Sequence, residues 1–410
     1  MNPKLLKVEL SFFAVLLYSS ILSAQGWWFK KANFNQSSRT ASVGFAIGTG
    51  GFIGTGYDST SFKRNFSVYN QTNDTWTQIQ SIGGISGTGL ARDAASSFVI
   101  GTKAYVGLGQ GSNPYFKDFW EYDSGTDTWM QKANFAGTAR RGAAAFAVDN
   151  KGYVVCGQDQ NGFKNDLWMY DAAANVWSAK APFPSSARRL PVAFVVGTKA
   201  YVGTGDDGIF KNDFYKYDAI GNTWVAISAF SGTPRYGAVA FVIGTDGYVG
   251  TGYDNTLSNK KDFWKYNSLT DSWSQIQDFG GTARSNAVAF AIGNYGYVGT
   301  GYDTLVSNDL WSYDPTSNAI EEVDKFKTSI NIYPNPVVSN FTIAFNAESL
   351  NSFDKISFMM YDLNGREVKY IDKLESAQIS IDRDNLVSGL YLYKFIAGSH
   401  FLTSGKIIVK

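Results

Sequence analysis

The sequence predicts an all-β fold, a six-bladed β-propeller followed by a small Ig-like β-sandwich, and two observations indicate the propeller. One pattern recurs six times between residues 39 and 314, and a complete copy holds four short apolar runs. Each copy opens on an arginine, at steps of 47 to 53 residues: Arg39, Arg92, Arg140, Arg188, Arg235 and Arg284. Repeats of about fifty residues with four short strands are typical of propeller blades.

The fifth copy illustrates how one blade is built. Its strands are expected at residues 239–243, 248–252, 263–266 and 273–276, because each run is too short for a helix and a Gly-Thr-Asp-Gly turn separates the first two. A single four-stranded sheet of this kind has a bare edge and two apolar faces, so it is not stable alone. Blades therefore stack around an axis and bury one another's faces.

The sixth copy lacks an outer strand of its own. In the other copies the fourth strand carries a tryptophan, whereas the sixth has none after its Leu-Trp-Ser-Tyr-Asp run at 310–314. Residues 28–34 (Trp-Phe-Lys-Lys-Ala-Asn-Phe) match residues 129–135 (Trp-Met-Gln-Lys-Ala-Asn-Phe) almost throughout. We infer that the N-terminal strand completes the last blade and closes the ring. The propeller is expected to span residues 25–320.

Residues 1–24 are interpreted as a signal peptide. Lys4 and Lys7 precede an apolar stretch at 10–22, and Ser23 and Ala24 are small residues suited to cleavage. The stretch is short for a bilayer span, and no later stretch approaches 18 apolar residues. We therefore expect an exported protein with no transmembrane segment.

The composition excludes some partners and cross-links. The 36 basic and 35 acidic residues nearly balance, so no nucleic acid partner is expected. The single cysteine excludes an intrachain disulfide.

The segment after Asp314 differs from the repeats. Residues 321–327 are charged and are expected to be a linker, and residues 328–410 hold alternating apolar runs that predict the sandwich. This segment contains Tyr-Pro-Asn-Pro at 333–336, Tyr-Asp-Leu-Asn-Gly-Arg at 361–366 and Ser-Gly-Leu-Tyr at 388–391. In this order the motifs resemble a type A sorting domain of the type IX secretion system of Bacteroidetes-type bacteria. The resemblance implies a Sec step, recognition by the type IX machinery, and a place outside the cell or on the outer-membrane surface.

The repeat resembles the kelch family of β-propellers. All six copies share the apolar strand, and five of them continue into a glycine pair, the third having Val155-Cys156-Gly157. The pair is Gly-x-Gly, as at 54–56, where kelch units usually have adjacent glycines. This superfamily includes copper-radical oxidases of the galactose oxidase kind, which need imidazole ligands and a Cys–Tyr cross-link. His400 lies outside the propeller, and Cys156 takes a small-residue strand position that predicts core packing. Such an oxidase is therefore excluded.

Other catalytic centres lack their residues as well. One histidine and one cysteine cannot build a zinc site, and a serine triad would have no propeller histidine as its base. We assign no metal, no cofactor and no catalytic residue, and carboxylate and arginine chemistry remains open.

The repeated charges are interpreted as a structural collar. The arginine near the first strand and the aspartate after the second strand should lie at the same mouth of the propeller, and like charges there need neutralisation. Arg–Asp pairing within or between blades is therefore expected. The residues assigned to this collar are Arg39, Arg140, Arg235, Arg284, Asp58, Asp254 and Asp303.

Departures from the repeat are the better candidates for a ligand site. The second copy has Gln110-Gly111 where the first, fifth and sixth have Tyr-Asp, which should leave Arg92 without its standard partner. The third copy has Gln158-Asp159 and the fourth Asp206-Asp207 at this place. Blade-specific loops add aromatic residues, which are suited to sugars or peptides, although they could equally anchor their loops. The residues assigned to ligand binding are Arg92, Gln110, Tyr115, Phe116, Gln158, Asp159, Phe163, Arg188, Asp206, Asp207, Phe210 and Tyr236.

Two functions fit this pattern. The first is a secreted or surface-displayed binding module for a glycan, a peptide or a surface partner. The second is a metal-free carbohydrate-active enzyme, an isomerase of the sialic acid epimerase kind or a lyase, with an arginine binding a carboxylate and an aspartate acting as base. Near-identical blades favour binding, because an active site needs one asymmetric cluster.

Overall fold

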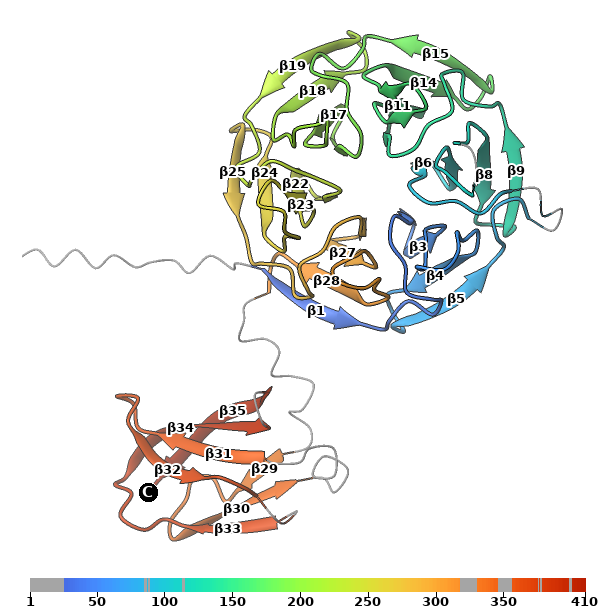
Figure 1. Cartoon of the computed structure of the whole chain (residues 1–410). Helices are drawn as coiled ribbons and strands as arrows, with labels where there is room; N and C mark the ends of the chain where they lie inside the picture. Colours follow the sequence, from blue (N-terminus) through green and yellow to red (C-terminus); the bar gives the residue numbers. More distant parts are fainter. Residues whose placement is uncertain are drawn as a thin grey trace, which may run out of the picture. The chain divides into compact units, whose positions relative to one another are not determined.

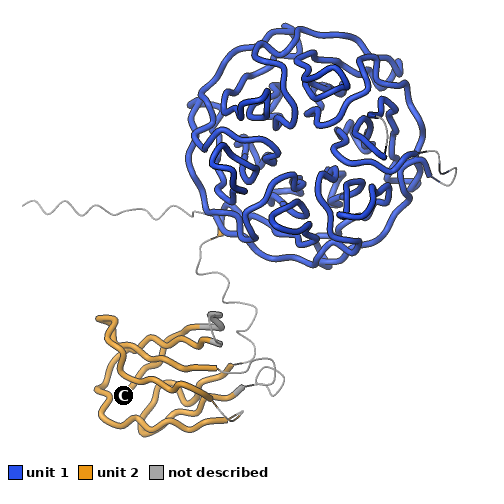
Figure 2. Tube along the Cα trace, in the orientation of Figure 1, with its two compact units in different colours: residues 1–316 blue, residues 317–410 orange. Residues whose placement is uncertain are grey.

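The computed structural model describes residues 26–84, 87, 89–112, 115–317, 330–345, 356–374, 376, 378–397 and 400–410. The chain divides into two compact units, Met1–Thr316 and Ser317–Lys410 (Figure 2). The expected signal peptide at 1–24 and the expected linker at 321–327 lie outside the described residues. In the described part of the chain, no helix has the length and apolarity that a membrane crossing needs.

Six four-stranded antiparallel sheets surround an axis as the blades of a propeller (Figure 1). In order along each sheet, blade 1 contains β2 (Val43–Ile47), β3 (Gly50–Gly54), β4 (Phe66–Asn70) and β5 (Thr75–Ile79), and blade 2 contains β6 (Ser96–Ile100), β7 (Lys103–Gly107), β8 (Phe119–Asp123) and β9 (Thr128–Lys132). Blade 3 contains β10 (Ala144–Val148), β11 (Lys151–Val155), β14 (Leu167–Asp171) and β15 (Val176–Lys180), and blade 4 contains β16 (Val192–Val196), β17 (Lys199–Gly203), β18 (Phe214–Asp218) and β19 (Thr223–Ile227). Blade 5 contains β21 (Val239–Ile243), β22 (Asp246–Gly250), β24 (Phe263–Asn267) and β25 (Ser272–Gln275), and blade 6 contains β26 (Val288–Ile292), β27 (Tyr295–Gly299), β28 (Leu310–Asp314) and β1 (Trp27–Lys31). Two short two-stranded sheets lie outside the blades: the hairpin of β12 (Gln158–Asp159) with β13 (Gly162–Phe163), and β20 (Arg235–Tyr236) paired with β23 (Tyr253–Asp254), which flank β21 and β22 in the chain.

The N-terminal strand β1 is the outer strand of blade 6, as the sequence predicts. It pairs antiparallel with β28, and Trp28 lies opposite Tyr313 as Trp129 lies opposite Tyr122 in blade 2. The ring is therefore closed by strands from the two ends of the propeller sequence, and blade 6 has no unpaired strand position.

The outer tryptophans also join neighbouring blades. The indole Nε1 of Trp129 donates to the carbonyl of Gln80 in the preceding blade at 2.8 Å, and Trp28 donates to Gln277 in the same way at 3.2 Å. Trp28 is 3% exposed and makes the same kind of contact as its counterparts. The strand that closes the ring thus also ties blade 6 to blade 5.

Aromatic side chains fill the space between blades. Phe98 and Tyr105 of blade 2 stack on each other, and both meet Tyr170 of blade 3. Gly152 on β11 allows this close approach, because a Cβ there would lie 2.1 Å from the Phe98 ring. Equivalent layers repeat around the ring and form its core.

The C-terminal unit has two antiparallel sheets around one core, the two-layer arrangement expected of a sandwich. Phe341, Phe358 and Phe395 are fully buried between them. One sheet contains β29 (Ile330–Tyr333), β30 (Asn340–Phe345) and β33 (Gln378–Asp382), and the other contains β32 (Glu367–Ile371), β31 (Ile356–Tyr361), β34 (Gly389–Ala397) and β35 (His400–Val409).

Candidate functional site

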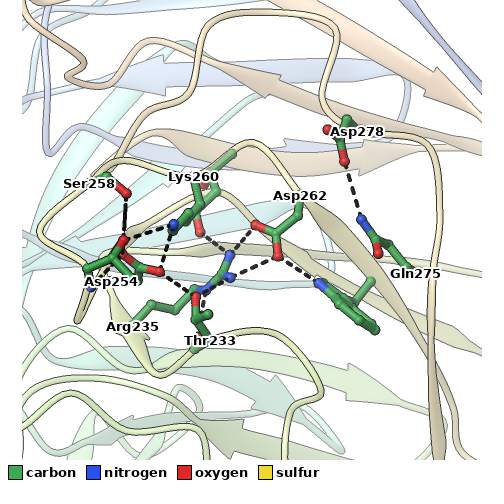
Figure 3. A network of polar contacts seen from close by, with 11 residues as sticks. Thr233, Arg235, Asp254, Ser258, Lys260, Asp262, Gln275 and Asp278 are labelled. Atoms are coloured by element: carbon green, nitrogen blue, oxygen red, sulfur yellow. Dashed lines mark hydrogen bonds and ion pairs between the residues drawn. The ribbon is translucent and has the colours of Figure 1, made fainter.

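Each blade buries one arginine near the mouth, the end of the propeller at which the second strand of each blade ends. Arg235 is fully buried, and Figure 3 shows its guanidinium between Thr233 and Asp262. Its Nη1 donates to Asp262 Oδ1 at 2.6 Å and its Nη2 donates to Asp262 Oδ2 at 2.8 Å, a bidentate pair. Nη1 also donates to the Thr251 carbonyl, and the guanidinium lies 5.0 Å from the centre of the Phe230 ring.

All six arginines that open the repeats are held in this way, and we call them the arginine collar. Each guanidinium binds a polar side chain that directly precedes the third strand of its own blade. The acceptors are Asn65 for Arg39, Asp118 for Arg92, Asp166 for Arg140, Asp213 for Arg188, Asp262 for Arg235 and Asp309 for Arg284. The collar holds the start of the third strand against the end of the second.

The expected pairing of the collar with Asp58, Asp254 and Asp303 is wrong. These carboxylates lie beyond the second strand and accept hydrogen bonds from their own loops, and none of them pairs directly with a collar guanidinium. Asp254 is an example: its Oδ2 lies 2.8 Å from Lys260 Nζ, and its Oδ1 accepts from the Thr256 amide at 3.0 Å. Asp254 and Asp303 reach the collar only through a threonine, since Thr233 and Thr282 each donate to the aspartate at 2.7 Å and accept from the arginine. Burial raises the pKa of Asp254, but these hydrogen bonds outweigh it and hold the pKa well below its usual range.

The predicted ligand-binding role of Arg92, Arg188 and Phe116 is also corrected. Arg92 and Arg188 belong to the arginine collar, and Phe116 packs against one of its members. Arg92 is fully buried and binds both oxygens of Asp118, at 2.7 and 2.6 Å, so it does have a partner. Phe116 lies 4.7 Å from the Arg92 guanidinium. In the other blades a phenylalanine five residues before the arginine has this role, and blade 2 has Ile82 at that point of the fold. Phe116 therefore replaces a missing structural ring.

The positions that vary between blades lie beside the collar. In each blade the residue after the collar arginine pairs, through the backbone, with the residue after Gly-x-Gly, and we call these the variable pairs. They are Thr40 with Tyr57, Asp93 with Gln110, Arg141 with Gln158, Arg189 with Asp206, Tyr236 with Tyr253, and Ser285 with Tyr302. Charged and amide side chains gather in the pairs of blades 2, 3 and 4.

Loop aromatics cover the variable pairs of the next blade. Tyr115 of blade 2 has its ring 5.9 Å from the guanidinium of Arg141 in blade 3, and Phe163 has its ring 5.7 Å from that of Arg189 in blade 4. Phe210 of blade 4 repeats this relation, since its ring lies 4.9 Å from that of Tyr236 in blade 5. The structure thus brings these predicted aromatics together with polar groups at successive blade junctions.

The predicted polar residues differ in how far they are already bound. Asp206 accepts from Arg189 at 3.0 Å, and the same arginine donates to Gln158 across the blade junction at 3.2 Å. Asp159 and Asp207 form ion pairs within their own loops, Asp159 with Lys164 and Asp207 with Lys211, each at 2.9 Å. These two aspartates therefore hold loops in place.

Sequence reasoning missed Asp93, Arg141 and Arg189. One oxygen of Asp93 is buried without a hydrogen-bond partner. Burial raises the pKa of this carboxyl to about 6, although Arg141 opposes the rise. The signal for the two arginines was present, because only the third and fourth copies open on Arg-Arg, at 140–141 and 188–189.

The axis is narrow beneath the variable pairs. Next to the axis, one residue from each blade combines a left-handed backbone, with φ between 47° and 61°, with an amide that donates to the corresponding carbonyl of the preceding blade. This closed ring consists of Ala41, Ala94, Gly142, Leu190, Gly237 and Asn286. The ring and its neighbours line a cavity of about 100 Å³, whereas ligand pockets usually measure about 300–1,000 Å³. A ligand would therefore lie on the mouth and not inside the axis.

Comparisons with known proteins agree with the fold of both units. Residues 40–234 match the family model of the KLHDC2/KLHL20/DRC7 Kelch-repeats domain, and residues 331–410 match that of the secretion system C-terminal sorting domain. The solved structure of YjhT is similar to 68% of this chain over 95% of its own length, with a TM-score of 0.59 at 18% identity, which shows the fold alone. No curated protein matches the chain.

The repeat, the six blades and these matches define a kelch-type β-propeller. More particularly, the chain is a kelch-type propeller that carries a type IX secretion C-terminal sorting domain, and it is exported to the cell surface or beyond. Within the described residues, no group of three or more His, Cys, Asp or Glu side chains is arranged to hold a metal ion.

Proposed function

We propose that this exported propeller is a binding module of a Bacteroidetes-type bacterium, cleaved from a signal peptide at residues 1–24, whose ligand lies on the mouth over blades 2 to 4. The variable pairs are the observation that carries this proposal. Residues shared by all blades build the collar and are buried, whereas the residues that differ lie beside it. A site made by differences between blades is asymmetric, as the recognition of one ligand requires.

The chemistry of these pairs suits a glycan. Flat aromatic faces from Tyr115 and Phe163 lie next to guanidinium groups, and the amides of Gln110 and Gln158 can donate and accept hydrogen bonds. Sugar rings present apolar faces and hydroxyl groups that match both kinds of side chain. A peptide is the other occupant to be tested.

Asp93 is the observation that favours the enzymatic alternative. A carboxyl with a pKa of about 6 beside an arginine is suited to proton transfer, so a metal-free isomerase or lyase would use Asp93 as its base. This alternative requires turnover of the bound sugar, and binding alone would not support it.

A glycan array probed with the full exported chain tests the proposal. We expect binding to a restricted set of glycans, loss of that binding in Arg141→Ala, and retention in Thr40→Ala, the matched position of blade 1. Mass spectrometry of the bound glycans after incubation would detect turnover and would then favour the enzyme. If no glycan and no peptide binds, the mouth is not a ligand site and an architectural role takes its place.

A further inference from the structure

Arg141 differs from every other arginine near the mouth, and this difference extends the proposed function on which the inference rests. The six collar arginines bind side-chain acceptors, and Arg189 binds Asp206 and Gln158. Arg141 is half-buried and its guanidinium lies 5.9 Å from the centre of the Tyr115 ring, and in the part of the chain that the structure describes this guanidinium has no hydrogen bond or ion pair. A guanidinium with five donors beside a binding surface is therefore available to an external acceptor.

Asp93 is the neighbouring group with an unmet hydrogen bond. The backbones of the two blades are joined next to these side chains, because the Gly142 amide donates to the Ala94 carbonyl at 2.9 Å. The buried Oδ1 of Asp93 has no hydrogen-bond partner, and Arg141 acts on this carboxyl only through its charge, which lowers the Asp93 pKa. The Arg141 guanidinium, which has no acceptor, and the Asp93 carboxyl, whose buried oxygen has no hydrogen-bond partner, thus lie at the same junction between blades 2 and 3.

The net charge of the side chains at this junction limits the charge that a ligand can carry. Arg141 and Arg189 supply two positive charges, Asp206 supplies one negative charge, and Asp93 supplies a second when it is ionised. The net charge of zero to plus one suits a monoanion, and a doubly charged phosphate would be repelled by the carboxylates. The planar fork of one guanidinium matches a carboxylate, which can accept two parallel hydrogen bonds.

We propose that Arg141 binds the carboxylate of an acidic sugar of the hexuronate class, with Asp93 hydrogen-bonded to the same residue and the Tyr115 ring beside it. Gln110 and Gln158, the backbone partners of Asp93 and Arg141, supply amides for the sugar hydroxyl groups. Hydroxyl recognition separates this ligand from a peptide carboxylate, which offers one anionic group without a ring of hydroxyls.

Binding should strengthen as the pH falls through about 6. The charged group that acts on Asp93 is Arg141, and the backbone partner of Asp93 is the uncharged Gln110. Lys63 of blade 1, whose backbone pairs with Arg92, is held by Asp58, and Arg189 is held by Asp206. Ionised Asp93 repels the sugar carboxylate and partly neutralises Arg141, whereas protonated Asp93 donates a hydrogen bond. The effect ends near pH 3.5, where the ligand carboxylate is itself protonated.

Isothermal titration of the full chain with the methyl glycoside of galacturonic acid, which carries a single carboxylate, tests the inference. We expect Arg141→Gln to weaken binding by roughly 10–100-fold, as the loss of a charge-assisted hydrogen bond predicts, and Thr40→Ala to leave it unchanged. The wild-type affinity should be about tenfold higher at pH 5.5 than at pH 7.5, and Asp93→Asn should remove most of this dependence. Circular dichroism confirms that each variant is folded.

The methyl ester of the same glycoside and an acidic tripeptide distinguish the possible failures. Equal binding of the ester overturns the inference on the carboxylate and leaves the mouth as a glycan site. Tighter binding of the tripeptide, abolished by Arg141→Gln, overturns the choice of a sugar. No binding of any glycan or peptide at the mouth overturns the proposed function together with the inference.

Discussion

Replacing Trp28 with alanine should open the ring at blade 6. The side chain is 3% exposed, and its ring lies 5.0 Å from Phe263 and 5.1 Å from both Phe279 and Tyr313. Truncation of a buried tryptophan costs about 3–5 kcal/mol, and the lost bond to the Gln277 carbonyl accounts for about 1 kcal/mol of that sum. Trp28→Phe should therefore cost distinctly less, because it keeps most of the ring contacts.

Denaturant titration followed by tryptophan fluorescence measures the change in unfolding free energy, and hydrogen exchange locates it. Trp129→Ala is the matched control, because Trp129 has the same role in a blade made of continuous chain. We expect both alanine variants to lose stability, but only Trp28→Ala should lose amide protection along both β1 and β28. A loss below about 1 kcal/mol, with protection on β28 unchanged, would refute the closure of the ring by this strand.

The remaining predictions concern buried ionisable groups. Arg140→Leu should lower the unfolding free energy by about 3 kcal/mol in denaturant titration, because it leaves Asp166 unpaired. Adding Asp166→Leu should recover part of that loss. Equal stability of the single and the double variant would contradict the pairing. Because the raised pKa of Asp93 makes the folded state hold a proton that the unfolded state releases, its ionisation lowers stability as the pH rises through about 6. Asp93→Asn should therefore stabilise the fold by about 1–2 kcal/mol at pH 8 and not at pH 4 in thermal melts, and a gain at both pH values would contradict the assignment. Burial raises the pKa of the Cys156 thiol to about 12, so iodoacetamide should label it only after unfolding, and labelling of the native chain would disprove its burial.

The fold could be predicted because its signals are local and repeated. Five of the six blades are each formed by one continuous stretch of about fifty residues, and the similarity of residues 28–34 to 129–135 identified the N-terminal strand that completes the sixth and closes the ring. The buried position of Cys156 followed from its alignment with small residues of the other blades.

The site was predicted less well, because side-chain partners depend on geometry that spacing does not encode. The collar arginines were paired with the aspartates of the loops, whereas the true acceptors precede the third strand. Arg141 and Arg189 were overlooked, since each directly follows a collar arginine and was not considered separately from that arginine. In an extended chain successive side chains point to opposite faces, so each of these two arginines could have been predicted to point away from the collar arginine before it.

Hydrogen exchange of the full chain with its tightest glycan bound tests the central claim most directly. We predict that protection on binding is confined to the variable pairs of blades 2 to 4, with the largest change in the segments that contain Asp93 and Arg141. Protection at the outer strands, at the opposite end of the propeller or in the C-terminal unit, with the mouth unchanged, would contradict the account.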